Sequence, residues 1–185
     1  MAKGVGASKY DSCWAGRLTR LMGSNKVVNL AQSGYITAQV LPNYTQHPKI
    51  DPENNVDAAL KHNPTCIIIS MTTNDIAQGI AVKDIMDNIA TTVRYAREKG
   101  VRYVVVTTPF PRKIDQASTQ KFLAYRDEVL ATYDKLASNI FDPLADADHL
   151  PRSEYLSSDK LHPNDTGNRL MFLCLEKTLR NMPCQ

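Results

Sequence analysis

The sequence predicts an α/β fold in which a parallel β-sheet carries helices on both faces. Two apolar runs rich in β-branched residues, 66–70 and 101–107, have the length and the flanking turn residues of buried strands. Stretches with helical spacing of apolar residues alternate with these runs, an arrangement typical of parallel sheets covered by helices. The 185 residues suffice for a core of their own, and we expect a single domain over residues 1–185.

The remaining elements follow from the same patterns. Residues 26–31 form a weaker third strand candidate, and residues 139–142 a short fourth one. Gly100 is a helix stop signal, and Asn164 after a proline is a helix start signal. The helical patterns cover residues 14–22, 56–62, 82–99, 120–138 and 165–180.

Composition and charge exclude several classes of function. The 22 basic and 19 acidic side chains give a net charge of +3, and the basic residues are scattered, which argues against a nucleic-acid-binding protein. The four cysteines are far apart and lack a C-x-x-C pair, so we expect free thiols and no zinc cage or disulfide framework. No apolar run is long enough for a transmembrane segment, and residues 1–9 lack the apolar part of a signal peptide. Neither the compartment nor the oligomeric state is indicated.

Two polar positions follow predicted strands at the edge where parallel sheets bind ligands. Asn74 comes after the strand that ends at Ser70, and its amide is suited to donating a hydrogen bond to an oxyanion. An Asn-Asp pair in this position is also common as a turn or a helix cap. Gly34 follows residues 26–31, where it either exposes a backbone N–H to a ligand or simply makes a turn.

Asp159 and His162 form the strongest catalytic candidate. A general base needs a partner that fixes its tautomer and stabilises its charged form, and a carboxylate three residues away can do both. A bare D-x-x-H pair is common on protein surfaces. The Pro163-Asn164 sequence and the glycine that follow make this pair more specific, and we interpret it as catalytic.

The chain resembles the SGNH (GDSL-like) hydrolase family in three motifs. Its counterparts of the second, third and fifth family blocks are, in this order, Gly34, the run Thr72-Thr73-Asn74-Asp75 and Asp159-x-x-His162-Pro163. The resemblance implies a three-layer α/β/α, flavodoxin-like fold and esterase or acylhydrolase activity. It runs the whole length of the chain, because Gly4 to Ser8 and the later Trp14 look like the tail of the first block. Thr72 stands where the family usually has glycine, which predicts an altered pocket loop.

The same alignment predicts where the nucleophilic serine lies. Counting back from Gly4 and Trp14 puts the family's serine immediately before Met1, so we expect the first strand and the G-D-S block to lie upstream of it. We then expect either a disrupted sheet or a surrogate strand. The pair Asp11-Ser12 imitates the motif, but no apolar strand precedes it, and we expect Ser12 to cap the helix that carries Trp14.

The resemblance implies a role for each candidate residue. A serine attacks an ester carbonyl, His162 accepts its proton, and Asp159 orients the imidazole. The Gly34 N–H and the Asn74 side chain complete the oxyanion hole. No metal or other cofactor is required, and the expected substrate is a small-molecule, carbohydrate or lipid ester.

Two other interpretations remain open at this point. The chain is either a binding module that kept the family fold without the nucleophile, or an unrelated flavodoxin-like regulatory or nucleotide-binding domain. The second of these predicts that Asp159 and His162 are not hydrogen bonded to each other and do not face Asn74.

Overall fold

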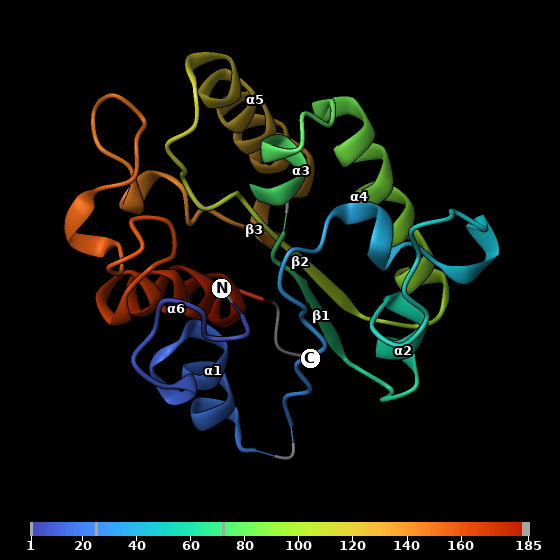
Figure 1. Cartoon of the computed structure of the whole chain (residues 1–185). Coiled ribbons are helices and arrows are strands. Elements are labelled where there is room, and N and C mark those ends of the chain that lie inside the picture. The colour runs from blue at the N-terminus through green and yellow to red at the C-terminus, as the bar shows by residue number, and fades with distance from the viewer. Residues whose placement is uncertain (1, 25, 72, 183–185) are drawn as a thin grey trace.

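The computed structural model describes residues 2–24, 26–71 and 73–182, and its centre is a parallel β-sheet (Figure 1). The sheet has the order β1 (Cys66–Ile69), β2 (Tyr103–Thr107) and β3 (Ala137–Ser138). Ile67 of β1 is in register with Val104 of β2, and the four residues of β1 all pair with β2. Alternate residues of each strand therefore point to opposite faces of the sheet.

One face of the sheet is covered by α4 (Val82–Glu98) and α5 (Gln116–Tyr133), with α2 (Val56–Leu60) beside them (Figure 1). The side chains of β1 and β2 on this face pack against buried apolar residues of the three helices. The cluster contains Ile67 and Ile69 of β1 and Val104 and Val106 of β2.

The opposite face is covered by α1 (Trp14–Met22) and α6 (Asp165–Arg180), which pack against each other (Figure 1). Val105 and Ile68 point to this side and belong to a second apolar cluster with residues of both helices. Two separate helical layers thus enclose the sheet, and the predicted three-layer α/β/α class is confirmed.

Most helices have the predicted positions. The bounds of α1 and α6 coincide with those expected from the sequence, and α4 ends within one residue of its predicted end. The prediction for 120–138 is wrong at both ends, because Asp115 caps α5 through the Ser118 N–H (2.7 Å) and Asp134 leaves helical conformation with a φ of 42°. The short helix α3 (Thr73–Ala77) was not predicted.

The cap predicted for Ser12 is also wrong. Cys13 is the N-cap of α1, and its Sγ accepts a hydrogen bond from the Gly16 N–H at 3.4 Å. Ser12 instead ends a 3₁₀ helix, Tyr10–Ser12.

Two predicted strands are absent from the sheet of described residues. Residues 26–31 run without ladder hydrogen bonds, and the Asn29 side chain instead accepts a local hydrogen bond from the Ala31 N–H (3.1 Å). Residues 139–142 lie beyond the end of β3, since the N–H groups of Ile140 and Phe141 both donate to the Thr108 hydroxyl at 2.9 Å. Among the described residues, the sheet thus ends at β1 on one side.

Three further expectations concern single residues or segments. Cys13, Cys66 and Cys174 are free thiols, as expected, whereas Cys184 and the departure at Thr72 lie outside the described residues. None of the described helices combines the length and the apolar character that crossing a membrane requires.

Candidate active site

Asp159 and His162 are hydrogen bonded to each other. Oδ2 of Asp159 lies 2.8 Å from Nδ1 of the imidazole. The other carboxylate oxygen accepts the backbone N–H groups of Leu161 (2.8 Å) and His162 (2.9 Å) and the Ser157 hydroxyl (2.8 Å). The pair is therefore held in one geometry by four hydrogen bonds to a single carboxylate.

These hydrogen bonds fix the protonation of the pair. The backbone N–H of His162, then its ring, and further donors hold the pKa of the Asp159 carboxyl well below its usual range. Because an ionised carboxylate only accepts hydrogen bonds, Nδ1 carries the ring proton in the neutral imidazole. The Nε2 lone pair is then free to accept a proton, and no hydrogen bond joins Nε2 to another residue within the described ranges.

The loop around His162 is anchored on both sides. The carbonyl of His162 accepts the Ser157 N–H at 2.8 Å, and Pro163 forms an isolated β-bridge with Leu156. Asn164 then caps α6, its side chain accepting the Thr166 and Gly167 N–H groups at 2.9 and 3.0 Å. The imidazole thus stands immediately before a capped helix, as the sequence predicted.

The N-terminal loop packs directly on His162. A methyl group added at Gly6 would lie 2.7 Å from Cβ of His162 and 2.6 Å from the Pro163 carbonyl oxygen. Gly6 also has a φ of +90°, a conformation that residues with a side chain rarely adopt. Glycine is required here because two backbones approach closely beside the imidazole.

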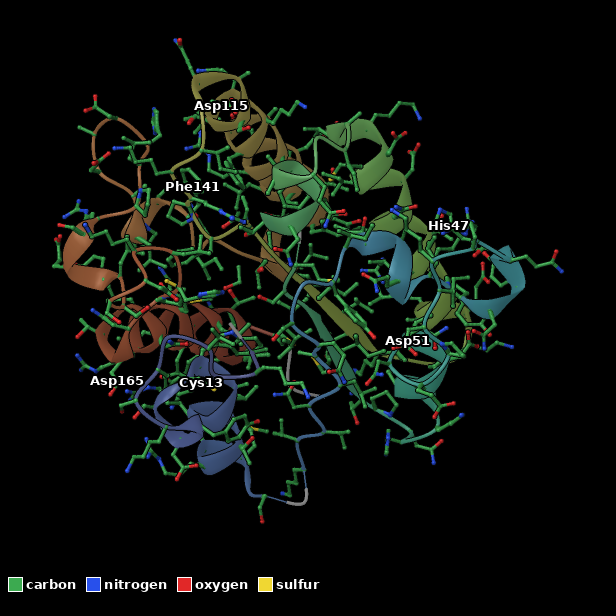
Figure 2. The ribbon with its side chains drawn as sticks, in the orientation of Figure 1. Cys13, His47, Asp51, Asp115, Phe141 and Asp165 are labelled. Carbon is green, nitrogen blue, oxygen red and sulfur yellow. The ribbon has the colours of Figure 1, made fainter. Side chains whose placement is uncertain are left out.

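Hydrogen bonds hold this loop in place at both ends. Ser8 donates its N–H and its hydroxyl to the two carboxylate oxygens of Asp165, at 2.8 and 2.6 Å. Asp165 opens α6, and Figure 2 shows it on the side of the molecule where α1 and α6 meet. At the other end, the Ala2 carbonyl accepts Nδ2 of Asn29 at 2.8 Å. Residues 2–8 therefore run from the 26–31 segment, past His162, to the start of α6.

Gly34 and Asn74 also lie near each other, linked through Tyr35. Nδ2 of Asn74 donates to the Tyr35 carbonyl at 3.0 Å, which occupies one of the two N–H bonds of the amide. Gly34 is exposed, has a φ of +81°, and has no atom within 4 Å of the place where a side chain would begin. The backbone at Gly34 is therefore open to a ligand.

All four predicted site residues belong to loops or helix starts around the carboxyl edge of the sheet. Asn74 lies on α3 directly after β1, and Figure 1 places α3 and the loops that lead into α6 on the side toward which β1 and β2 run. The structure brings Asp159 into contact with His162 and the Gly34 loop into contact with Asn74. No hydrogen bond or ion pair between described residues joins one pair to the other.

Two residues at this edge were not recognised from the sequence. Asp75 is fully buried and accepts both the N–H and the hydroxyl of Thr37, at 2.8 and 2.6 Å. The neighbouring Asn74 is a site candidate in the sequence, but an Asn-Asp pair is common in turns. No local pattern indicates that Asp75 binds a residue 38 positions earlier. Over the ranges that the structure describes, His, Cys, Asp and Glu side chains form no group of three or more suited to a metal ion.

Comparison with models of protein families shows to which family the chain belongs. The model of the GDSL-like lipase/acylhydrolase family matches residues 1–170. The chain belongs to this family. As a GDSL-like acylhydrolase, it is a hydrolase of a family whose substrates are small-molecule esters, and the interpretation as an unrelated flavodoxin-like domain is wrong.

Solved structures with the same fold include a GDSL-like lipase and an esterase. The structure of TesA is 16% identical, with a TM-score of 0.71 over 97% of this chain and 93% of that one. The psychrotrophic esterase EstA from Pseudoalteromonas sp., inhibited by monoethylphosphonate, is 16% identical, with a TM-score of 0.67 over 97% and 91% of the two chains. A GDSL-like lipase from Bacteroides thetaiotaomicron is 17% identical, with a TM-score of 0.64 over 82% and 74%. No curated protein sequence matches this GDSL-like acylhydrolase significantly.

Proposed function

We propose that this GDSL-like acylhydrolase is a serine esterase that cleaves carboxylic esters through an acyl-enzyme, with His162 as general base. The observation that carries the proposal is the hydrogen bond between Asp159 and Nδ1 of His162, because it leaves Nε2 available for a nucleophile. The family match supports a hydrolase.

Each step of the reaction has a candidate group. The serine Oγ attacks the ester carbonyl while Nε2 of His162 accepts its proton, and the imidazolium then protonates the leaving alcohol. Water attacks the acyl-enzyme in the same way and releases the acid and the free serine. The Gly34 N–H and the second Asn74 N–H stabilise the negative charge on the carbonyl oxygen in both steps.

We expect this serine immediately upstream of Met1, as the alignment of Gly4 and Trp14 with the first family block implies. Serines near the pair have other partners, since Ser157 donates to Asp159 and Ser8 donates to Asp165. The path of residues 2–8 supports an upstream nucleophile, because it begins beside Asn29 and passes His162. The edge of β1 that pairs with no described strand supports an additional strand next to it.

Hydrolysis of a short-chain nitrophenyl ester tests the proposal with two forms of the protein. One is residues 1–185, and the other is extended upstream through the next in-frame strand and serine. We expect hydrolysis only in the extended form. His162→Ala in that form should abolish hydrolysis. The control is His62→Ala, which should not affect it, because His62 is exposed and lies just before β1, at the end of this strand that is remote from the candidate site.

The alternative is a binding module on the same fold. Absence of hydrolysis in both forms, with the extended form folded, would contradict the esterase proposal and favour this alternative. Hydrolysis that survives His162→Ala would contradict the assigned role of His162.

A further inference from the structure

Asp75 connects the two loops that carry Gly34 and Asn74. Its side chain is 0% exposed, and Oδ1 accepts both the N–H (2.8 Å) and the hydroxyl (2.6 Å) of Thr37. Thr37 is also 0% exposed and begins a 3₁₀ helix, Thr37–Val40, three residues after Gly34. The contact therefore lies inside the protein, directly behind the open Gly34 loop.

The neighbouring residues make a second link in parallel. Asn74 donates to the Tyr35 carbonyl at 3.0 Å, so two successive residues of α3 bind two positions of the segment after Gly34. Two links at adjacent positions fix orientation as well as distance. Asn88 of α4 adds a hydrogen bond from Nδ2 to the Thr37 hydroxyl at 3.1 Å, which ties the arrangement to the helical layer.

The burial of this carboxylate is energetically costly. Desolvation raises the pKa of Asp75, and the hydrogen bonds from Thr37 offset only part of the effect. Oδ2 is buried and has no hydrogen-bond partner in the described part of the chain. Buried polar atoms without partners are rare in proteins and call for an explanation. The two hydrogen bonds to Oδ1 account for a carboxylate at this position, since an apolar residue could not hold the Thr37 N–H and hydroxyl together.

We propose that Asp75 and Thr37 are positioning residues that hold the Gly34 N–H and the free Asn74 N–H at the separation that an oxyanion requires. This inference rests on the proposed esterase function. Neither residue serves as a donor to the oxyanion. Asp75 acts through the adjacent Asn74, and Thr37 acts through the segment that carries Gly34 three residues earlier. Donors of this kind stabilise charge that develops in the transition state, so their displacement lowers kcat more than it raises KM.

The test uses the form of the protein that hydrolyses the nitrophenyl ester. Thr37→Val removes the hydroxyl and keeps the N–H, and Asp75→Ala removes the whole link. We expect kcat to fall about 10-fold and about 100-fold, respectively, with little change in KM. Asp75→Asn keeps an acceptor at Oδ1 and should recover most of the kcat lost in Asp75→Ala.

Two controls separate positioning from general loss of structure. Thr178→Val removes a buried hydroxyl in α6, on the other face of the sheet, and should leave kcat unchanged. Asn74→Ala combined with Asp75→Ala should lower kcat by less than the product of the two single effects, because Asp75 acts partly through Asn74. Additive losses, or a loss of kcat that equals the unfolded fraction by circular dichroism, would overturn the proposal.

Hydrogen exchange provides a readout that needs no hydrolysis. The amides of residues 33–37 should exchange faster in Asp75→Ala than in Asp75→Asn. Unchanged exchange would overturn the link itself. If the unmutated protein hydrolyses no ester while exchange still depends on Asp75, the esterase proposal and the catalytic role fail but the link remains, so the two failures are distinguishable.

Discussion

Asp159 binds His162 twice, with Oδ2 on the ring nitrogen Nδ1 at 2.8 Å and Oδ1 on the backbone N–H of the same residue at 2.9 Å. One carboxylate thus fixes both the tautomer of the imidazole and the turn that carries it. The first of these contacts belongs to the reaction chemistry, and the second belongs to the local fold.

Replacement of this carboxylate by an amide tests the first contact. Asp159→Asn keeps the shape of the side chain, but its NH₂ group cannot accept the Nδ1 proton. We expect kcat for the nitrophenyl ester to fall by about 10,000-fold, as for the corresponding change in a Ser-His-Asp enzyme. Asp84→Asn, an exposed aspartate of α4, is the matched control and should retain full activity. A loss of less than tenfold in Asp159→Asn would refute the assigned role.

Gly6 and Gly100 form a natural pair for testing the packing of the N-terminal loop. Their φ values are +90° and +89°, but a side chain at Gly100 would meet no atom within 4 Å, whereas one at Gly6 would collide with His162 and Pro163. Gly100→Ala should cost about 1–2 kcal/mol of unfolding free energy from backbone conformation alone. Gly6→Ala should cost more, and it alone should reduce ester hydrolysis. Equal losses in urea denaturation would show that the loop does not pack on His162.

Ser8→Ala removes one hydrogen bond to Asp165 and leaves the backbone contact in place. We expect a loss of about 0.5–1 kcal/mol at pH 7, because the bond is charge-assisted but exposed. The hydroxyl of Ser8 is the largest cause that lowers the pKa of Asp165, so this contribution is present above the unfolded pKa and disappears as pH falls through the lower folded value. The difference between the two proteins should therefore vanish in acid. Ser24→Ala, at an exposed position, should match the unmutated protein throughout.

The buried Asp75 predicts the opposite dependence on pH. Burial raises its folded pKa above the unfolded value of about 3.9, so the folded state binds a proton that the unfolded state has released between these two values. The contribution of Asp75 to stability is therefore full below the unfolded pKa and is lost as pH rises through the folded pKa. The amide side chain in Asp75→Asn does not titrate. The unfolding free energy of this variant should therefore rise relative to that of the unmutated protein between pH 4 and pH 7. Parallel curves would contradict a raised pKa.

The local sequence was sufficient for the helices whose ends are marked by local signals. Asn164 caps α6 with its own side chain, and Gly100 ends the region of α4 with a positive φ, so both boundaries could be predicted. The strand predicted at 26–31 failed because strand formation depends on a neighbour, which a pattern within six residues cannot supply.

In the candidate site, too, contacts between residues close in the sequence could be predicted and contacts between distant residues could not. Asp159 and His162 are three residues apart, and their contact could be predicted from spacing. The bonds between Ser8 and Asp165 and between Thr37 and Asp75 join residues 157 and 38 positions apart. Neither pair has a local signature, and only the packing of the sheet layers brings its members together.

The contact between Ser8 and Asp165 also constrains the order in which the protein folds. The segment from α2 to β3 is continuous in the chain and contains the whole described sheet together with one helical layer. The other layer needs both α1 and α6, so α1 has to wait for α6 before the two can pack against each other. Trp14, the single tryptophan, lies in α1 and is only 7% exposed, and its backbone N–H donates to Asn168 of α6 at 3.1 Å. Its fluorescence should therefore report the closing step of folding rather than the collapse of the sheet.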